Sequence, residues 1–309
     1  MGKTAFVFPG QGAQALGMGK DAYEASDSVK QLFEQANHIL GIDLTTLIFE
    51  GPEEALKQTA NTQPALLTVS AAYLKLLEGS GLQADYVAGH SLGEYSALVA
   101  AGALSFEDAV RIVRARGQYM EQAVPSGQGA MAAVLGAERE ALSSLCESIS
   151  ANGTGVELAN VNCPGQIVVS GTAAGVQAVV EQGKEIGAKR VISLEVSGPF
   201  HSSLMKPAAE KLADTLATAS WQDASVPVVA NVTAKEATSA SELRELLVEQ
   251  VYSPVLWEDS VRYLIGQGVD TFVEIGSGTV LAGLIKKIDR SVRVISVNSV
   301  AALEALKAE

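Results

Sequence analysis

The sequence predicts an α/β protein whose main sheet is mostly parallel and whose chain carries a second, smaller domain as an insertion. Short strand-like runs alternate with longer helix-like segments, the order of elements changes in mid-chain, and turn-forming residues flank that middle part. The 309 residues, 48% of them hydrophobic, are enough for two domains with buried cores.

The outer parts of the chain show the alternation expected of parallel strands joined by helices. Runs typical of strands occur at Thr4–Phe8, Asp85–Gly89, Pro227–Val232, Thr271–Ile275 and Val292–Val297. Segments with apolar residues at helical spacing include Asp21–Leu40, Pro64–Leu77, Leu92–Ala101, Phe106–Gln122, Ser202–Ala217 and Ser241–Val251. Pro64 suits a first helical position, where the amide has no partner within the helix. We expect residues 1–127 and 198–309 to form this large domain.

Residues 128–197 follow a different order, in which strand, helix, two strands, helix and strand succeed one another. These elements are expected at Ala130–Leu135, Glu138–Ser148, Glu157–Val161, Gln166–Ser170, Ala173–Ile186 and Arg190–Val196. The βαββαβ order is typical of a ferredoxin-like domain. Turn-rich segments at Val124–Gly129 and Ser197–Pro199 mark its entry and its exit.

Composition excludes several classes of function. The 22 basic and 35 acidic side chains give a formal net charge of −13, the wrong sign for binding nucleic acid or an anionic membrane. Two cysteines and three histidines show no metal-ligand spacing, so no metal site is expected. The apolar start is too short for a signal peptide, and no apolar stretch is long enough to span a membrane. We therefore expect a cytoplasmic protein.

A serine flanked by glycines, Ser91, lies at the centre of the sequence Gly-His-Ser-Leu-Gly at positions 89–93. This pattern is typical of the nucleophile elbow of α/β-hydrolase-like domains, in which a sharp strand-to-helix turn exposes the serine hydroxyl. A plain tight turn is the alternative, because the pattern also arises by chance. The strand expected before it and the alanine-rich helix expected after it favour the elbow.

A serine hydroxyl needs a base to become a good nucleophile, and histidine is the usual one. His38 lies in an amphipathic run and is typical of a solvated helix residue. His90 adjoins Ser91, and we expect it to pack under the turn or to contact substrate. His201 follows the loop that leaves the inserted domain, so we expect it in the cleft between the domains, as the base. An exposed residue at a helix start is the alternative, and no acid stands out as its partner, which leaves a backbone carbonyl as an acceptor.

A glycine-rich turn at 9–12 follows the first expected strand, and its amides can converge on an anion or on a developing oxyanion. These glycines also loosely fit a dinucleotide-binding fingerprint, although Gly17 and Gly19 delay the helix that would receive a pyrophosphate. Arg116 lies near a buried helical stripe and is placed to point inward, where it would bind a carboxylate; a solvated arginine is the alternative. Gln63 occupies the expected N-cap before Pro64, an unusual residue there and a hint of function.

Six motifs in order extend over nearly the whole chain. They are Phe-Pro-Gly-Gln-Gly at 8–12, Thr-Gln-Pro-Ala at 62–65, Gly-His-Ser-Leu-Gly-Glu-Tyr at 89–95, Arg-Gly at 116–117, Gly-Pro-Phe-His-Ser at 198–202 and Gln-Val-Tyr-Ser-Pro-Val at 250–255. Together they resemble the malonyl-CoA:acyl carrier protein transacylases. That family carries its small domain where the βαββαβ insertion is expected.

The resemblance implies a role for each matching residue. Ser91 would be the acylated nucleophile and His201 its base, oriented by the carbonyl of Gln250. Gln11 and the amide of Leu92 would form the oxyanion hole.

The remaining roles concern the substrate. Arg116 would bind the malonyl carboxylate, and Phe200 would crowd the methyl group of a methylmalonyl competitor. Further substrate contacts are expected from His90, from Gln63, and from Asn160 and Asn162 on a loop of the small domain.

The reaction implied by the resemblance moves a malonyl group from CoA to the phosphopantetheine thiol of acyl carrier protein, in fatty acid biosynthesis. The CoA thioester is a substrate, no cofactor is needed, and a monomer is expected. A serine thioesterase or esterase is the alternative, and a dinucleotide-binding module the weaker one. At 274–279 the chain departs from the family, since Ser277 and Thr279 replace a proline and a lysine. A looser loop is expected there, with Lys286 and Lys287 supplying the missing cation.

Overall fold

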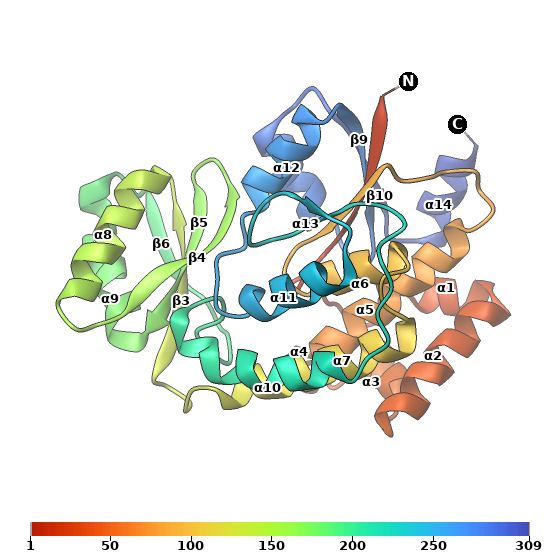
Figure 1. Ribbon diagram of the computed structural model, residues 1–309, viewed down its shortest axis with the longest axis horizontal. Helices are drawn as coiled ribbons and strands as arrows, with labels where there is room; N and C mark the ends of the chain where they lie inside the picture. Colours follow the sequence, from red (N-terminus) through yellow and green to blue (C-terminus); the bar gives the residue numbers. More distant parts are fainter. Residues whose placement is uncertain (1, 309) are drawn as a thin grey trace.

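The molecule has a larger body and a smaller lobe, which lies on the left in Figure 1. The computed structural model describes residues 2–308, so the expected domain limits at 1 and 309 lie outside it. Over that range the strands form two sheets, one in each part.

The larger sheet has six strands within the described range, in the order β10 (Arg293–Val297), β9 (Val269–Ile275), β1 (Lys3–Phe8), β2 (Tyr86–Gly89), β7 (Val228–Val229) and β8 (Glu236–Ala237). All neighbouring pairs are parallel except β7 and β8. The predicted α/β fold with a mostly parallel sheet is thus confirmed in its coarse form. Because parallel strands end at the same edge, the segments after β1, β2 and β9 lie close together.

Side chains of β1 alternate between two cores, as the two-residue period of a strand requires. Phe6 and Phe8 pack on one face and Ala5 and Val7 on the other, so the sheet is buried on both faces. The helices of this part are α1 (Lys20–Ala25), α2 (Asp27–Leu40), α3 (Leu44–Glu50), α4 (Glu53–Lys57), α5 (Thr59–Leu77), α6 (Gly93–Ala100), α7 (Phe106–Gln122), α10 (Lys206–Ala217), α11 (Ala240–Gln250), α12 (Trp257–Gly266), α13 (Val280–Ile288) and α14 (Val300–Lys307).

The smaller sheet is antiparallel and has the order β4 (Val156–Cys163), β5 (Gln166–Thr172), β3 (Gly129–Leu135) and β6 (Arg190–Ser193). Helices α8 (Arg139–Ala151) and α9 (Ala173–Gln182) follow β3 and β5, and the 3-10 turn η1 (Gly183–Ile186) follows α9. Figure 1 shows both helices on the outer side of the lobe. Strand β4 also joins the two parts: the amide of Val161 donates to the carbonyl of Val255 (2.9 Å), and the amide of Val255 donates to the carbonyl of Ala159 (2.8 Å).

The start of α5 corrects one prediction. The helix begins at Thr59, its N-cap is Gln58, and Pro64 lies inside it, so Gln63 is not a capping residue. A proline there leaves the carbonyl four residues earlier without its helical donor. Nη1 of Arg114, from α7, donates to that carbonyl of Ala60 at 2.8 Å, so a neighbouring helix supplies the bond that the proline removes.

Other expected elements also differ from the observed ones. In the smaller lobe, the strand expected at 190–196 ends at Ser193, and the helix expected at 173–186 is α9 followed by η1. The run 21–40 is two helices, because Ser26 has an extended backbone between α1 and α2. The expected strand at 227–232 is only two residues long, since the chain turns so that the amide of Ala234 bonds to the carbonyl of Ala230. The segment 202–217 opens with the 3-10 turn η2 (Ser203–Met205) before α10. Helix α7 has the predicted bounds.

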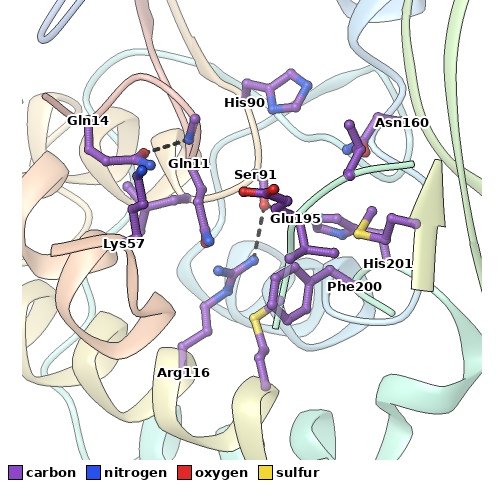
Figure 2. A pocket seen from close by; sticks show the side chains of 16 residues that line it. Gln11, Gln14, Lys57, His90, Ser91, Arg116, Asn160, Glu195, Phe200 and His201 are labelled. Atoms are coloured by element: carbon purple, nitrogen blue, oxygen red, sulfur yellow. Dashed lines mark hydrogen bonds between the residues drawn. The ribbon is translucent and has the colours of Figure 1, made fainter. Parts of the chain in front are cut away.

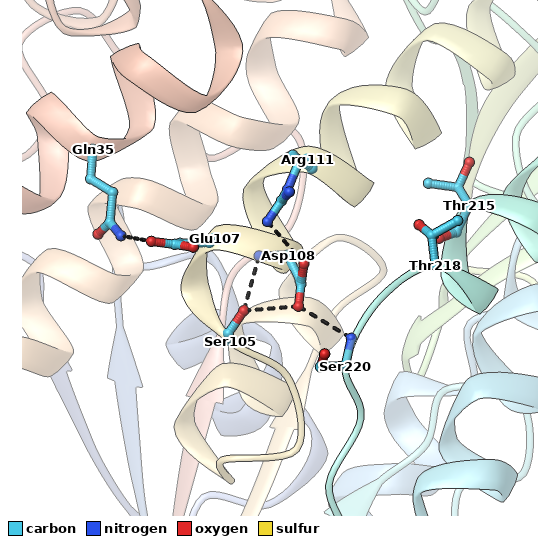
Figure 3. A network of polar contacts seen from close by, with 8 residues as sticks. All are labelled: Gln35, Ser105, Glu107, Asp108, Arg111, Thr215, Thr218 and Ser220. Carbon is cyan, nitrogen blue, oxygen red and sulfur yellow. Dashed lines mark hydrogen bonds and ion pairs between the residues drawn. The ribbon is translucent and has the colours of Figure 1, made fainter.

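Helix α7, which carries Arg116, is anchored at its N-terminus by the polar contacts in Figure 3. The hydroxyl of Ser105 accepts from the amide of Asp108 and caps the helix. The Asp108 carboxylate also accepts from the amide of Ser220 (3.3 Å) and pairs with Arg111 (3.0 Å), which fixes α7 to the loop after α10. Within residues 2–308, no helix combines the length and apolarity needed to cross a membrane.

Candidate active site

Ser91 lies in a sharp turn between β2 and α6, with a left-handed φ of 51°. The flanking glycines are required by close packing. A Cβ at Gly93 would lie 2.0 Å from the carbonyl oxygen of Phe8, and one at Gly89 would lie 1.9 Å from the carbonyl carbon of Gly93. A side chain at either position would force β1, β2 and α6 apart, so the predicted strand–turn–helix context is present.

His201 contacts Ser91 directly. Its Nε2 lies 2.8 Å from the Ser91 Oγ, and its Nδ1 lies 2.8 Å from the main-chain carbonyl oxygen of Gln250. A carbonyl can only accept, so Nδ1 carries the proton and Nε2 is free to accept the serine proton. Burial, helped by the charge of Arg116, lowers the pKa of His201 to about 3. At neutral pH the imidazole is therefore in its basic form.

Two residues that line the same cavity as Ser91, Gln11 and Leu92, have main-chain amides that bear on the site. Neither amide has a hydrogen-bond acceptor among the residues that the structure describes. The turn that bears Gln11 presses against the elbow, because a Cβ at Gly10 would lie 2.2 Å from the carbonyl oxygen of His90. Unpaired amides beside a nucleophile are donors that an oxyanion can use.

Arg116 is the buried cation of the site, with 1% of its surface exposed. Its Nη1 donates to Oε1 of Gln63 (2.8 Å), and its Nη2 donates to Oε1 of Gln250 (2.9 Å) and to Oγ of Ser91 (3.2 Å). These direct partners are all neutral, and burial lowers the pKa of the guanidinium. A buried guanidinium without a touching carboxylate favours an anionic ligand.

The smaller lobe contributes residues to the other side of the site. Oδ1 of Asn162 lies 2.8 Å from Nε2 of His90, whose ring is 5.7 Å from that of Trp257. Asn160 and Asn162 are on strand β4, not on a loop as expected. Asn160 and the buried Phe200 line the cavity, whereas Asn162 reaches it through its bond to His90.

These side chains surround a cavity of about 360 Å³ at the junction of the two parts, shown in Figure 2. Sequence reasoning selected Gln11, His90, Ser91, Leu92, Arg116, Asn160, Phe200 and His201 among its lining residues. It did not select Gln14, Lys57, Met120, Met131, Leu194, Glu195 and Val196. Residues 194–196 directly follow β6, and the other four come from separate segments, so only the folded arrangement brings them together.

No helix follows the glycine-rich turn at 9–12 directly, since α1 begins at Lys20. This is the delay expected from Gly17 and Gly19, and it disfavours a pyrophosphate site. The loop at 274–279 is not loose: the Ser277 hydroxyl donates to the carbonyl of Ala13 (2.6 Å), and the Glu274 carboxylate accepts the amides of Leu281 and Ala282 (both 2.9 Å). Lys287 contacts Gln166 at 3.2 Å and lies outside the cavity lining.

An α/β fold with a serine–histidine pair at a strand-to-helix elbow is typical of enzymes that carry an acyl group on serine. The family model described as "Acyl transferase domain" matches residues 5–304, and the chain belongs to this acyl transferase family. The resemblance inferred from the motifs is thereby confirmed.

Named relatives and solved structures agree with this assignment. The chain is 55% identical over 304 residues to the "Malonyl CoA-acyl carrier protein transacylase" of Bacillus subtilis (strain 168), covering 98% of this chain and 96% of the relative. It is 51% identical to the protein of that name from Staphylococcus aureus (strain MRSA252), over 97% and 96% of the two chains. A crystal structure of an acyl carrier protein S-malonyltransferase from Vibrio cholerae superimposes with a TM-score of 0.96 at 46% identity, covering 98% and 99%. A malonyl-transacylase in complex with its type II PKS acyl-carrier protein gives 0.96 at 43% identity, covering 99% of both.

Proposed function

We propose that this chain is a malonyl-CoA:acyl carrier protein S-malonyltransferase. It takes a malonyl group from CoA, holds it as an ester on Ser91, and passes it to the phosphopantetheine thiol of an acyl carrier protein. One observation carries the proposal: the Ser91 Oγ lies between the Nε2 of His201 and the Nη2 of Arg116, at 2.8 and 3.2 Å. A nucleophile is thus placed between its base and a cation suited to a second, charged end of the acyl group.

The first half-reaction acylates the serine. His201 takes the proton of Ser91 as the oxygen attacks the thioester carbonyl, and the amides of Gln11 and Leu92 stabilise the oxyanion. The tetrahedral intermediate collapses, the carbon–sulfur bond breaks, and CoA leaves as a thiol with the proton from His201. In the second half-reaction the carrier thiol gives its proton to His201 and attacks the ester, and Ser91 regains the proton as it leaves.

Arg116 selects the acyl group in this proposal. A malonyl carboxylate that pairs with the guanidinium replaces the contact of Nη2 with the Ser91 hydroxyl, which frees that hydroxyl for attack. Gln63 and Gln250 hold the guanidinium in the same direction before and after binding. Phe200 limits the space around the α-carbon, and Asn160, with His90 and Asn162, borders the thioester side.

We also propose the finer description of the fold. The large domain is α/β-hydrolase-like and comprises residues 1–127 and 198–309, and residues 128–197 form a ferredoxin-like domain. The chain order βαββαβ and the sheet order β4–β5–β3–β6 support the second part of this description. We propose a cytoplasmic monomer, since both cysteines are buried free thiols and one chain supplies the whole candidate site.

The test is covalent loading. Incubation with malonyl-CoA, followed by peptide mass mapping, should place a malonyl group on the peptide that contains Ser91, and Ser91→Ala should remove the label. Adding a carrier protein with its phosphopantetheine arm should discharge the ester and load the carrier. If water discharges the ester as fast as the carrier does, the protein is a thioesterase instead.

A further inference from the structure

A buried carboxyl group lies directly behind the elbow and has no part in the mechanism above. Glu94, on α6, is 1% exposed and does not line the cavity. Its Oε2 accepts from the main-chain amide of Asn231 (2.9 Å) and from Nε2 of Gln250 (3.1 Å). A carboxylate is costly to bury, so its place beside the nucleophile calls for a reason.

Asn231, which follows the short strand β7, is fully buried and contacts both sides of the elbow. Its Nδ2 donates to the carbonyl of Gly89 (2.7 Å), and its Oδ1 accepts the amide of Ser91 (2.8 Å). Ser91 has a left-handed backbone, which a residue with a side chain keeps only when its surroundings enforce it. The Asn231 side chain supplies that constraint on both flanks of the turn.

Gln250 connects this arrangement to the rest of the site. Its side-chain Nε2 lies within hydrogen-bond reach of Oε2 of Glu94, of Oδ1 of Asn231 (3.2 Å) and of the Ser91 carbonyl (3.0 Å). Its Oε1 accepts from Arg116, and its main-chain carbonyl accepts from His201. The side-chain amide of Gln250 thus lies between Glu94 and Arg116. Its NH₂ group donates to the carboxyl group, and its oxygen accepts from the guanidinium.

We propose that Glu94 and Asn231 are positioning residues for the acyl transfer. Asn231 holds the backbone of Ser91 in its reactive turn. Glu94 fixes Asn231 and also fixes Gln250, and Gln250 in turn directs His201 and Arg116. We call this pair the elbow clamp. Burial raises the pKa of Glu94 to about 7, while its bonds to Asn231 and Gln250 and the charge of Arg116 favour the carboxylate. The proposal rests on the proposed function only in taking Ser91 as the nucleophile.

The test uses the full chain and phenylmethanesulfonyl fluoride, a probe that has no carboxylate. The Ser91 oxygen would attack sulfur, fluoride would leave, and His201 would take the proton, so only the nucleophile and its base are measured. Two variants remove or weaken the clamp, Asn231→Ala and the isosteric Glu94→Gln. Asn298→Ala is the matched control, because it deletes a partly buried asparagine bond, to the carbonyl of Gly278, away from the cavity.

We expect the rate constant of sulfonylation per reactive site to fall roughly 30-fold in Asn231→Ala and about 5- to 10-fold in Glu94→Gln, because a small displacement of reacting groups has such effects. The control should stay within about twofold. With malonyl-CoA the same losses should appear in kcat, with KM nearly unchanged. A merely structural role predicts fewer titratable serines and a lower Tm, but an unchanged rate constant in the molecules that do react.

Wild-type rate constants in Glu94→Gln and Asn231→Ala overturn the proposal. If Asn231→Ala does not fold, Glu94→Gln decides alone, since it keeps the size of the side chain. The two proposals fail separately: a wild-type enzyme that is sulfonylated but not loaded by malonyl-CoA refutes the proposed function, while the effect of the clamp on sulfonylation is still measured.

Discussion

Strands β2 and β9 lie on either side of β1, and each leads into a helix at the same edge of the sheet, yet the two turns differ in how the helix begins. After β2, only His90, Ser91 and Leu92 precede α6, and the amide of Leu92 has no acceptor within residues 2–308. After β9, four residues intervene, and the Glu274 carboxylate accepts the first amides of α13. At the turn after β9, a carboxylate of the chain itself binds the N-terminus of the helix. At the turn after β2, the N-terminus of the helix is left for a ligand.

Each turn contains one serine. Replacing each serine by alanine should give the largest expected difference in covalent loading between the two turns. Ser91→Ala should abolish covalent loading by malonyl-CoA. Ser277→Ala should leave loading unchanged and lower Tm by about 2–4 °C, because it loses one buried hydrogen bond, to the carbonyl of Ala13. Mass mapping and thermal unfolding of both variants check this, and a label that persists in Ser91→Ala removes the elbow from the mechanism.

The base is the next largest effect. His201→Ala should lower the rate of serine acylation by roughly 10²- to 10⁴-fold, the usual scale for loss of a general base. His90→Ala should lower this rate much less, because His90 lines the cavity but contacts Asn162 and not the serine hydroxyl. Single-turnover kinetics with malonyl-CoA measure both, and a greater loss in His90→Ala contradicts the assignment.

Selectivity for a charged acyl group should depend on Arg116. Arg116→Ala should reduce malonyl transfer roughly 10²- to 10³-fold and narrow or reverse its advantage over acetyl transfer, because the carboxylate loses its cation. Arg114→Ala, two residues earlier on α7, removes an arginine that bonds to Ala60 away from the cavity, and it should keep the wild-type ratio. Initial rates with malonyl-CoA and acetyl-CoA at equal concentration give the ratios. The idea fails if Arg116→Ala retains the preference of the wild type.

The smallest effect concerns pH. With its pKa lowered to about 3, His201 remains a base as the pH falls from 8 to 5, so its own titration should add no step to the rate of acylation near the usual histidine pKa of about 6.5. A step near pH 7 that comes from Glu94, whose pKa is raised to about 7, should be absent in Glu94→Gln. The unfolded chain does bind a proton on His201 below about 6.5, whereas the folded one does not. The folded state should therefore lose stability as the pH falls from about 6.5 toward 3. Melting curves of the wild type and of His201→Ala between these pH values test the direction of this change, since the stability of the variant should fall less than that of the wild type.

The parts of the site that follow from neighbours in the chain were predictable from the sequence. Gly89 and Gly93 flank Ser91 because backbones approach closely there, and this requirement is visible as a spacing of glycines. His201 follows the exit of the inserted segment, and that position predicts a place between the two parts. The element order 128–197 was readable for the same reason, since each strand and helix has its own periodicity. The roles of Gln11, Arg116 and Gln250 stay predictions.

What the sequence did not indicate depends on contacts between distant segments. Asn231 meets Ser91 from 140 positions away, and it lies in a run that looked like an uninterrupted strand. The sequence predicts a helix start at Pro64, whereas in the structure Pro64 lies inside α5, and Arg114 from another helix supplies the hydrogen bond that the proline cannot donate. In both cases the partner that decides the local structure is far along the chain, so no window of neighbouring residues contains the information.

The bonding of β4 to Val255 has a consequence for how substrates enter. Val255 lies five residues after Gln250, whose carbonyl accepts a hydrogen bond from His201. The two hydrogen bonds between β4 and Val255 therefore connect the smaller lobe to the segment that orients the base. An outward movement of the lobe would break these two hydrogen bonds and displace the imidazole of His201. In the proposed reaction the donor, malonyl-CoA, and the acceptor, a carrier protein, differ greatly in size, and both must then reach Ser91 through the same cavity. Only the flexible phosphopantetheine arms of the two substrates have to enter that cavity, so neither substrate requires the lobe to move away from the base.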